Sequence, residues 1–376
     1  MCPRPAFPAL LRLLLRYGCA LTSRLRASVQ ACWGGWHGVA VTEDGEAYAW
    51  GGNENLQTGA TDAASEYLPL PARILPELRV TQVSAGGMHS LALTDTGDVW
   101  GWGQPLTTWG ASADTNVYAR QRSPMRVEGA ANVVRIAAGA FHNLALTASG
   151  HVLAWGNSDY GQLGLGSTTH VATPHVVDEL SKAGVTALAA GGWHSAALTA
   201  GGVVYVWGRG EHGRLGLGDA WRDRLRPVEL PLAARAAHVT LGGTHSCVLT
   251  EDGVLYSFGR VSFGRLGRGP SSGSANEPNP VELPLPPANC RWRVEAVSAG
   301  GRHTLALARA VPANVPAAAE GGVAVAGAPA PALSVLTSAS PMRRVASGSS
   351  LAGSARASLS FSPPPSPQPD HAGGAR

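Results

Sequence analysis

The chain has 376 residues, of which 44% are hydrophobic and 14% are charged. No apolar run is long enough to cross a bilayer, so the composition predicts a soluble globular protein with a large interior and no membrane span. The formal net charge is +4, but acids and bases nearly balance between residues 29 and 309, and the only lysine is Lys182. Because no stripe of basic and aromatic residues follows the chain, we expect no direct nucleic-acid binding by this region.

Residues 1–28 form a basic N-terminal segment with five arginines and no acid: Arg4, Arg12, Arg16, Arg24 and Arg26. On a helix, several of these arginines would face away from a row of leucines, which is the pattern of an organelle transit peptide. An unstructured start is the alternative. We therefore expect the protein in the cytoplasm or nucleus, or in a mitochondrion or plastid if residues 1–28 are a transit peptide.

A repeat with a Gly-Gly-x-His signature fills residues 29–309. Its histidines follow one another at intervals of 51 to 53 residues, with a last interval of 58: His37, His89, His142, His194, His245 and His303. A fixed period of this length indicates stacked supersecondary units.

Two further markers keep phase with the first five histidines. A glycine lies eight residues after each histidine, and an aromatic residue followed by glycine lies thirteen residues after it. The aromatic residues are Trp50, Trp102, Trp155, Trp207 and Phe258. Between the markers, apolar and small residues alternate with period two, so each repeat contains at least a β-hairpin with two faces to bury. The sequence predicts an all-β fold, a β-propeller of about five and a half repeats.

The glycines before each histidine are expected on the innermost strand, where backbones converge. Gly192→Val should then disrupt the fold, whereas Gly210, in a presumed loop, should tolerate alanine.

The repeats at 137–166 (AAGAFHNLALTASGHVLAWGNSDYGQLGLG) and 189–219 (AAGGWHSAALTAGGVVYVWGRGEHGRLGLGD) resemble those of the regulator of chromosome condensation family. The resemblance implies a closed ring of seven blades. Five and a half repeats leave three alternatives: a ring with fewer blades, an open arc, or a sequence that lacks part of the array.

The loop after the aromatic residue differs between repeats. YGQLGLG (160–166), HGRLGLG (212–218) and FGRLGRG (263–269) keep its Leu-Gly pattern, whereas NLQTGA (55–60) and TTWGAS (107–112) are interpreted as degraded. Residues 310–376 form a tail rich in Ala, Pro and Ser, and we expect it to be disordered.

The sequence indicates no catalytic, cofactor-binding or metal-binding residue. The letters GRGEHG (208–213) fit a dinucleotide-binding turn, but the glycines that follow cannot sustain the helix that such a site needs. We interpret the six phased histidines as structural residues bonded between blades, and the five cysteines form no C-x-x-C pair.

Three functions remain open from the sequence. The first is a non-catalytic protein-interaction scaffold, for which a dense basic segment supplies a candidate docking patch: Arg209, Arg214, Arg222, Arg224 and Arg226. The second, implied by the family's founding member, is guanine nucleotide exchange on a Ran-type small GTPase. The third is UV-B sensing, as in a plant photoreceptor of this fold, but GGRHT (300–304) lacks the tryptophan of the photoreceptor's Gly-Trp-Arg-His-Thr motif.

Overall fold

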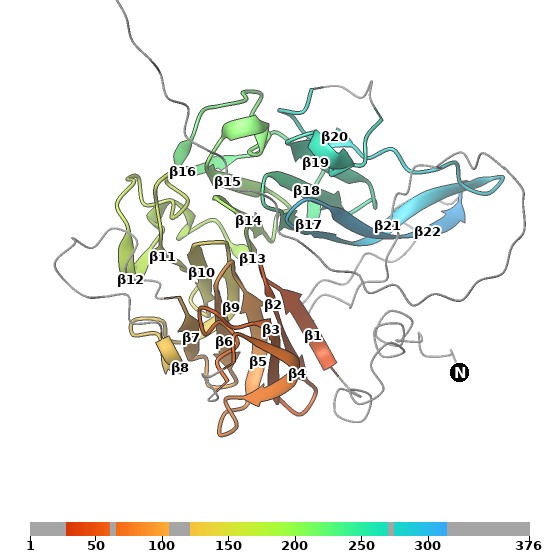
Figure 1. Cartoon of the computed structure of the whole chain (residues 1–376). Helices are drawn as coiled ribbons and strands as arrows, with labels where there is room; N and C mark the ends of the chain where they lie inside the picture. The colour runs from red at the N-terminus through yellow and green to blue at the C-terminus, as the bar shows by residue number, and fades with distance from the viewer. Residues whose placement is uncertain (1–27, 61–64, 105–120, 270–273, 314–376) are drawn as a thin grey trace, which may run out of the picture. The chain divides into compact units, whose positions relative to one another are not determined.

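A computed structural model describes residues 28–60, 65–104, 121–269 and 274–313 (Figure 1). The predicted N-terminal segment, apart from Ser28, and the tail beyond Ala313 lie outside the described residues. So does the second-repeat loop at 107–112.

The described residues form six antiparallel sheets joined in chain order, and their connections include three short 3₁₀ helices. The first strands of the sheets are β1 (Ser28–Trp33), β5 (Val80–Ala85), β9 (Val133–Ala138), β13 (Val185–Ala190), β17 (Ala236–Leu241) and β21 (Cys290–Ala299). The second strands are β2 (His37–Thr42), β6 (His89–Thr94), β10 (His142–Thr147), β14 (His194–Thr199), β18 (His245–Thr250) and β22 (Thr304–Pro312).

Five of the sheets add a third and a fourth strand. The third strands are β3 (Ala47–Gly52), β7 (Val99–Gly103), β11 (Val152–Gly156), β15 (Val204–Gly208) and β19 (Leu255–Gly259). The fourth strands are β4 (Tyr67–Ile74), β8 (Gln121–Arg126), β12 (Val171–Val176), β16 (Arg224–Glu229) and β20 (Asn279–Pro280). The 3₁₀ helices are η1 (Asp178–Leu180), η2 (Glu211–Gly213) and η3 (Ser262–Gly264).

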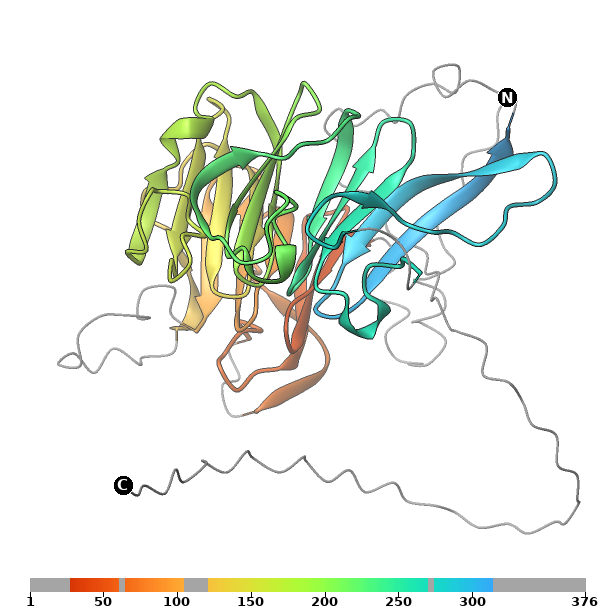
Figure 2. The same cartoon turned by 90° about the horizontal axis from the view of Figure 1, so that it is seen from above.

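Each sheet is a simple meander, and the sheets follow one another as the blades of a propeller (Figure 2). The predicted hairpin of each repeat is the pair of second and third strands. The first strands of successive sheets contact each other, so they form the inner edge of the array. The all-β propeller fold predicted from the sequence is confirmed.

The turn between the second and third strands is built in the same way in five repeats. A threonine Oγ1 accepts the N–H of the residue four positions later, as Thr199 does from Val203 at 3.1 Å. The glycine between them has a positive φ, +78° at Gly202, which is why glycine recurs eight residues after each histidine.

The hydrophobic core lies between neighbouring sheets. On β2, Val39 and Val41 pack in one buried cluster with Ala92 and Trp102 of the second sheet. The next interfaces repeat this arrangement, and the phased aromatic residues Trp102, Trp155, Trp207 and Phe258 are at most 2% exposed. Truncation of such a side chain to alanine typically costs about 3–5 kcal/mol, so these residues dominate the apolar part of each interface.

The paired glycines do not lie on the innermost strand, which corrects the expectation from the sequence. They form the connection between the first and second strands, and there they meet the connection of the next sheet. Main-chain hydrogen bonds run from sheet to sheet through them, for example Gly192 N–H to the Gly242 carbonyl at 3.1 Å and Ala140 N–H to the Gly191 carbonyl at 3.0 Å. Glycine is required because a Cβ on Gly192 would collide with the Gly243 carbonyl.

Gly210 corrects a second expectation. It lies at the start of η2 with an ordinary negative φ, but a Cβ at this position would collide with the main chain of Arg222. Gly210→Ala is therefore expected to be destabilising, because the loop is packed and its neighbour is backbone.

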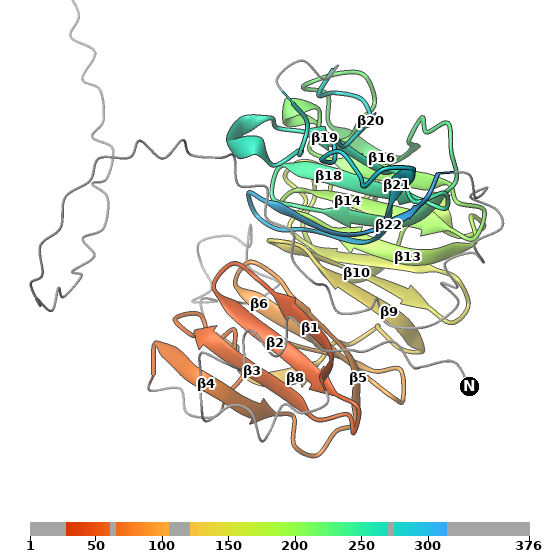
Figure 3. The same cartoon turned by 90° about the vertical axis from the view of Figure 1, so that its right-hand side faces the viewer.

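The described sheets do not close into a ring. The sixth sheet contains only β21 and β22, and the described strands of the first and sixth sheets are not paired (Figure 3). The open end is also seen at Gly301. A Cβ there would meet no described residue within 4 Å, whereas its counterparts Gly35, Gly87, Gly192 and Gly243 abut the next sheet. No helix among the described residues is long and apolar enough to cross a membrane.

Gly192→Val should lower the free energy of unfolding by about 3 kcal/mol, because the new methyl groups collide with main-chain atoms of the next blade. Gly301→Val is the matched control at the same motif position, and we expect a change of less than about 1 kcal/mol. Urea denaturation followed by circular dichroism measures both. Equal losses in the two variants would contradict the assigned contact between blades.

Candidate interaction site at the loop end

The phased histidines form hydrogen bonds between neighbouring sheets. Each Nε2 contacts the side chain of the residue that follows the histidine of the next repeat. The pairs are His37–Ser90 at 2.7 Å, His89–Asn143 at 2.9 Å, His142–Ser195 at 2.8 Å, His194–Ser246 at 2.9 Å and His245–Thr304 at 2.8 Å. All five histidines are at most 3% exposed.

Each hydroxyl in these pairs has a second partner, a main-chain carbonyl of the loop that follows the third strand in the histidine's own repeat. The donors and acceptors are Ser90 to Gln57 at 2.9 Å, Ser195 to Gln162 at 2.7 Å, Ser246 to Arg214 at 2.7 Å and Thr304 to Arg265 at 2.8 Å. Because the hydroxyl donates its proton to the carbonyl, it must accept one from Nε2, which assigns the neutral Nε2–H tautomer to the histidine. We call this unit the inter-blade clasp; four of the five histidines use the hydroxyl and carbonyl, whereas His89 bonds to the side-chain amide oxygen of Asn143.

The phased tryptophans contribute to the same unit. Ser90 pairs with Trp102 across β6 and β7, and Ser195 pairs with Trp207 across β14 and β15. Trp102 Nε1 donates to the Gln57 carbonyl and Trp207 Nε1 to the Gln162 carbonyl, each at 2.9 Å. The thirteen-residue spacing thus places an indole beside the hydroxyl, so that both reach one carbonyl. Sequence reasoning assigned no role to the hydroxyl, although the Ser or Thr after the histidine was the available signal.

The clasp differs at both ends of the array. Gly38 stands where later repeats have Ser, Asn or Thr, and the Trp50 ring lies against it, so a Cβ there would be 2.7 Å from Trp50 Cε2. In the sixth repeat, His303 is exposed. Trp155 Nε1 has no acceptor among the described residues, and the second-repeat loop that corresponds to Gln57 lies outside them.

Burial holds the clasp histidines neutral. It lowers the pKa of His37, His89 and His245 from 6.5 to about 4, and that of His142 to about 3. The pKa of His194 is also well below its usual value, first because of burial and then because of the charge of Arg214. A protonated imidazole would have to be desolvated in these interfaces, so the clasp is stable only in its neutral form.

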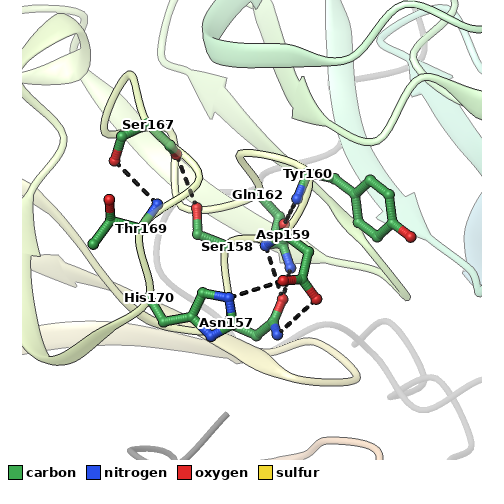
Figure 4. Close-up of polar contacts among 8 residues, drawn as sticks. All are labelled: Asn157, Ser158, Asp159, Tyr160, Gln162, Ser167, Thr169 and His170. Carbon is green, nitrogen blue, oxygen red and sulfur yellow. Dashed lines mark hydrogen bonds and ion pairs between the residues drawn. The ribbon is translucent and has the colours of Figure 1, made fainter. Parts of the chain in front are cut away.

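The clasp positions the loops after the third strands, because it binds their carbonyls. In the third repeat, Asn157, Asp159 and Gln162 form a polar network inside the loop, which Figure 4 shows. Gln162 Oε1 accepts the N–H of Tyr160 at 3.0 Å and leaves its main-chain carbonyl for the clasp. The ring of Tyr160 points away from this network (Figure 4).

The loop of the first repeat, interpreted from its sequence as degraded, keeps this arrangement. Gln57 Oε1 accepts the N–H of Asn55 at 2.8 Å, as Gln162 Oε1 does in the third repeat. Leu56 takes the left-handed conformation, with φ +61°, where Gly161 has φ +74°. The loop of the first repeat therefore keeps its backbone path, although its sequence lacks the Leu-Gly pattern.

Arginine and aromatic side chains collect on the loops and on the residues before the histidines, at one end of the sheets. We call this the loop end; the threonine–glycine turns lie at the opposite end. Trp193 contacts Phe141 and Tyr160, with ring centroids 4.6 and 5.3 Å apart, and Arg209 Cζ lies 4.2 Å from the Tyr160 centroid.

The same pattern continues in the fifth and sixth repeats. Arg265 and Arg302 lie over Phe263, with Cζ 5.6 and 5.4 Å from the ring centroid, and Phe263 is 73% exposed. The arginine–aromatic belt comprises Phe141, Tyr160, Trp193, Arg209, Arg260, Phe263, Arg265 and Arg302. Sequence reasoning found no such stripe because its members lie in different repeats and become neighbours only in the folded array.

Only part of the candidate docking patch predicted from the sequence is accessible. Arg214 is 1% exposed and ion-paired with Glu211, so its side chain is not available to a partner. Arg224 pairs with Asp219 and Arg226 with Glu179, while Arg222 is exposed. Of the five arginines only Arg209, which also pairs with Glu211 at 2.7 Å, joins the belt.

A model of the RCC1-like domain matches residues 19–306, about three quarters of the chain. The chain belongs to the RCC1-like domain family. It is similar to the ultraviolet-B receptor UVR8 of Arabidopsis thaliana, with 32% identity over 274 residues, 72% of this chain and 60% of that protein. It is also similar to the human E3 ubiquitin-protein ligase HERC2, with 33% identity over 285 residues, 75% of this chain and 6% of that protein. The chain thus spans less than two thirds of either relative.

Solved structures agree with this RCC1-like fold. Human WBSCR16 has a TM-score of 0.67 and 26% identity, with 75% of each chain covered. Yeast RCC1 (Prp20), in its complex with Kap60, has a TM-score of 0.63 and 25% identity, with 76% of this chain and 70% of that chain covered.

The described part of the RCC1-like domain contains no group of His, Cys, Asp and Glu side chains arranged to hold a metal ion. The Nε2 atoms of the clasp histidines are already bonded to side chains of the next blade. What the loop end can do is bind, because it combines the exposed ring of Phe263 and partly exposed rings in the third and fourth repeats with guanidinium donors on loops that the clasp holds in place.

The clasp predicts acid unfolding between pH 6.5 and 4. The unfolded chain takes up protons on histidine at about pH 6.5, whereas the folded chain does so near pH 4, so stability is complete above pH 6.5 and falls as the pH drops through this window. Each clasp histidine contributes up to about 1.4 kcal/mol per pH unit.

Chemical denaturation at a series of pH values tests this. His142→Asn should be less stable at pH 7.5 but lose less stability on acidification, and the exposed-site control His175→Gln should follow the wild type. A wild-type stability that stays constant from pH 7.5 to 5 would be inconsistent with buried neutral histidines.

Proposed function

We propose that this RCC1-like domain is a non-catalytic scaffold that binds a protein partner through its loop end. The observation that carries the proposal is the arginine–aromatic belt, in which Phe263 and Arg302 are exposed while the loops beneath them are fixed by the clasp. Exposed aromatic and arginine side chains on a rigid support are the residue types that dominate binding energy in protein interfaces.

The variety of the relatives supports a binding role rather than one particular reaction. A photoreceptor and a ubiquitin ligase are both similar to this chain, and the matched segment covers only 6% of the ligase. Because one fold occurs in proteins with different functions, the function depends on the residues of the site, which here lie on the loops. Photoreception itself is disfavoured, because Gly301 stands before Arg302 at the position of the tryptophan in the Gly-Trp-Arg-His-Thr motif.

Guanine nucleotide exchange on a Ran-type GTPase is the second candidate function. One feature favours it: the connection between β20 and β21 is longer than its counterparts, and Leu285 within it is 95% exposed. An exchange factor needs a protruding wedge, and this connection is the candidate. The four intervals between the first five histidines are nearly constant, at 51 to 53 residues, and leave no such insertion before His245.

Affinity purification from the protein's own cells, followed by mass spectrometry, tests the scaffold. The double variant Phe263→Ala/Arg302→Glu should lose at least about tenfold of the recovered partner. Arg235→Glu, at the opposite end of the sheets, is the matched control and should recover the partner at the wild-type level. Partners that all remain bound to the double variant would place the binding site elsewhere.

A second assay separates the two functions. A Ran-type GTPase loaded with fluorescent GDP should release it at the same rate with and without the purified domain. Acceleration that is lost on Leu285→Asp would establish exchange activity and overturn the non-catalytic proposal.

A further inference from the structure

We infer that the arginine–aromatic belt binds an acidic, extended peptide segment of the partner protein. This inference rests on the proposed scaffold function and adds the chemistry of the partner. It begins from the charges of the belt. Arg260 donates to Ser262 Oγ at 3.3 Å and Arg302 stacks on Phe263, and neither forms an ion pair with a described residue.

The guanidinium groups of the belt lie close enough to repel one another. The pKa of Arg265 is lowered first by burial and then by the charges of Arg260 and Arg302. The pKa of neighbouring Arg214 is lowered to about 10, first by burial and then by Arg209. Carboxylates placed along the belt would relieve this repulsion and accept hydrogen bonds from the free guanidinium N–H groups. Such bonds between two charged groups are the strongest hydrogen bonds available there.

The aromatic side chains indicate that the partner is a peptide with apolar residues among its acids. Phe263 is 73% exposed and Val261, in the same loop, is 64% exposed. Trp193 and Tyr160 offer a second apolar surface in the third and fourth repeats. Because the belt extends over four repeats, a single carboxylate cannot occupy it, whereas an extended segment gains about 3.3 Å per residue and can follow it.

An acidic peptide fits the belt better than a nucleic acid. Glu211 lies within the belt region and pairs with Arg209. Two further acids lie on the adjoining segment: Asp219 pairs with Arg224, and Asp223 accepts a hydrogen bond from the N–H of Gly210. A continuous phosphate backbone would meet these acids, and the chain's only lysine, Lys182, is not in the belt. A peptide can place its carboxylates opposite the exposed Arg260 and Arg302 and its neutral residues beside the acids. Arg265 is buried beneath these two arginines and bonded to Ser262 and Thr244.

Fluorescence anisotropy with the full-length protein tests the inference. The probe is a fluorescein-labelled peptide of about twelve residues that alternates Asp-Glu pairs with leucine. We expect a Kd below about 100 µM at low salt, weakening as salt is added. The same peptide with Asn and Gln in place of the acids should bind at least about tenfold more weakly.

Two variants locate the binding. Arg260→Glu/Arg302→Glu should weaken the acidic peptide at least about tenfold, because both side chains are exposed and the substitutions reverse the charge. Arg235→Glu, which makes the same charge change at the opposite end, should bind like the wild type. Circular dichroism verifies that each variant is folded.

Four results would overturn the inference: no measurable binding of the acidic peptide, equal binding of the neutral peptide, unchanged binding in the double variant, or tighter binding of a thymidine oligonucleotide of the same length. In each case the scaffold proposal is judged separately. If the cellular partner still depends on Phe263 and Arg302 but contains no acidic segment, the scaffold stands and the acidic-peptide inference fails.

Discussion

The buried hydrogen bond from a histidine to a hydroxyl of the next blade is the interaction on which the rest of this structure depends. It joins three elements that are distant in sequence: the start of a second strand, the second strand of the following sheet and the loop of the first sheet. In the third interface these are His142, Ser195 and Gln162. Because one hydroxyl serves both partners, a shift of either sheet would leave a buried polar group unpaired, at a cost of about 1–3 kcal/mol. The clasp therefore fixes the stacking of the blades and the position of the loops together.

This arrangement makes the protein a one-dimensional array of nearest-neighbour interfaces. Each interface combines one clasp, one set of glycine main-chain bonds and one apolar cluster. The last repeat has no following neighbour among the described sheets: Gly301 abuts nothing and His303 is exposed. The belt lies on the third to sixth repeats, so the segment with successive intact loops also carries the interaction surface.

Much of this fold follows from the sequence. The phase of His194, Gly202 and Trp207 predicts a hairpin with a tight turn, and the apolar alternation predicts that both of its faces are buried. The first and fourth strands were not predicted, because their pairing with the hairpin is set by tertiary contacts. The need for glycine at position 192 was predicted, but its location in the fold was not. A glycine that avoids a steric collision has the same sequence pattern whether it lies in a strand or in a connection between strands. The error at Gly210 has the same origin: its neighbour, the main chain of Arg222, cannot be inferred from spacing.

The candidate site was less predictable than the fold. The sequence predicts a docking patch from the arginines near residue 224, yet in the structure most of these arginines have acidic partners. The belt has no local signature, because Arg302 and Phe263 belong to different repeats and meet only through the stacking of blades. No member of the belt is an unusual residue at its own position in the sequence. The members form a common binding surface only because folding brings them together.

A double-mutant cycle tests the clasp most directly. His142→Ala, Ser195→Ala and the double variant are compared by urea denaturation, with His142→Ala/Ser246→Ala as the control pair from two different interfaces. We expect a coupling free energy of about 1 kcal/mol or more for His142 with Ser195, and additivity within about 0.5 kcal/mol for His142 with Ser246. Additive effects of His142→Ala and Ser195→Ala would show that the two side chains stabilise the protein independently, and would contradict the clasp.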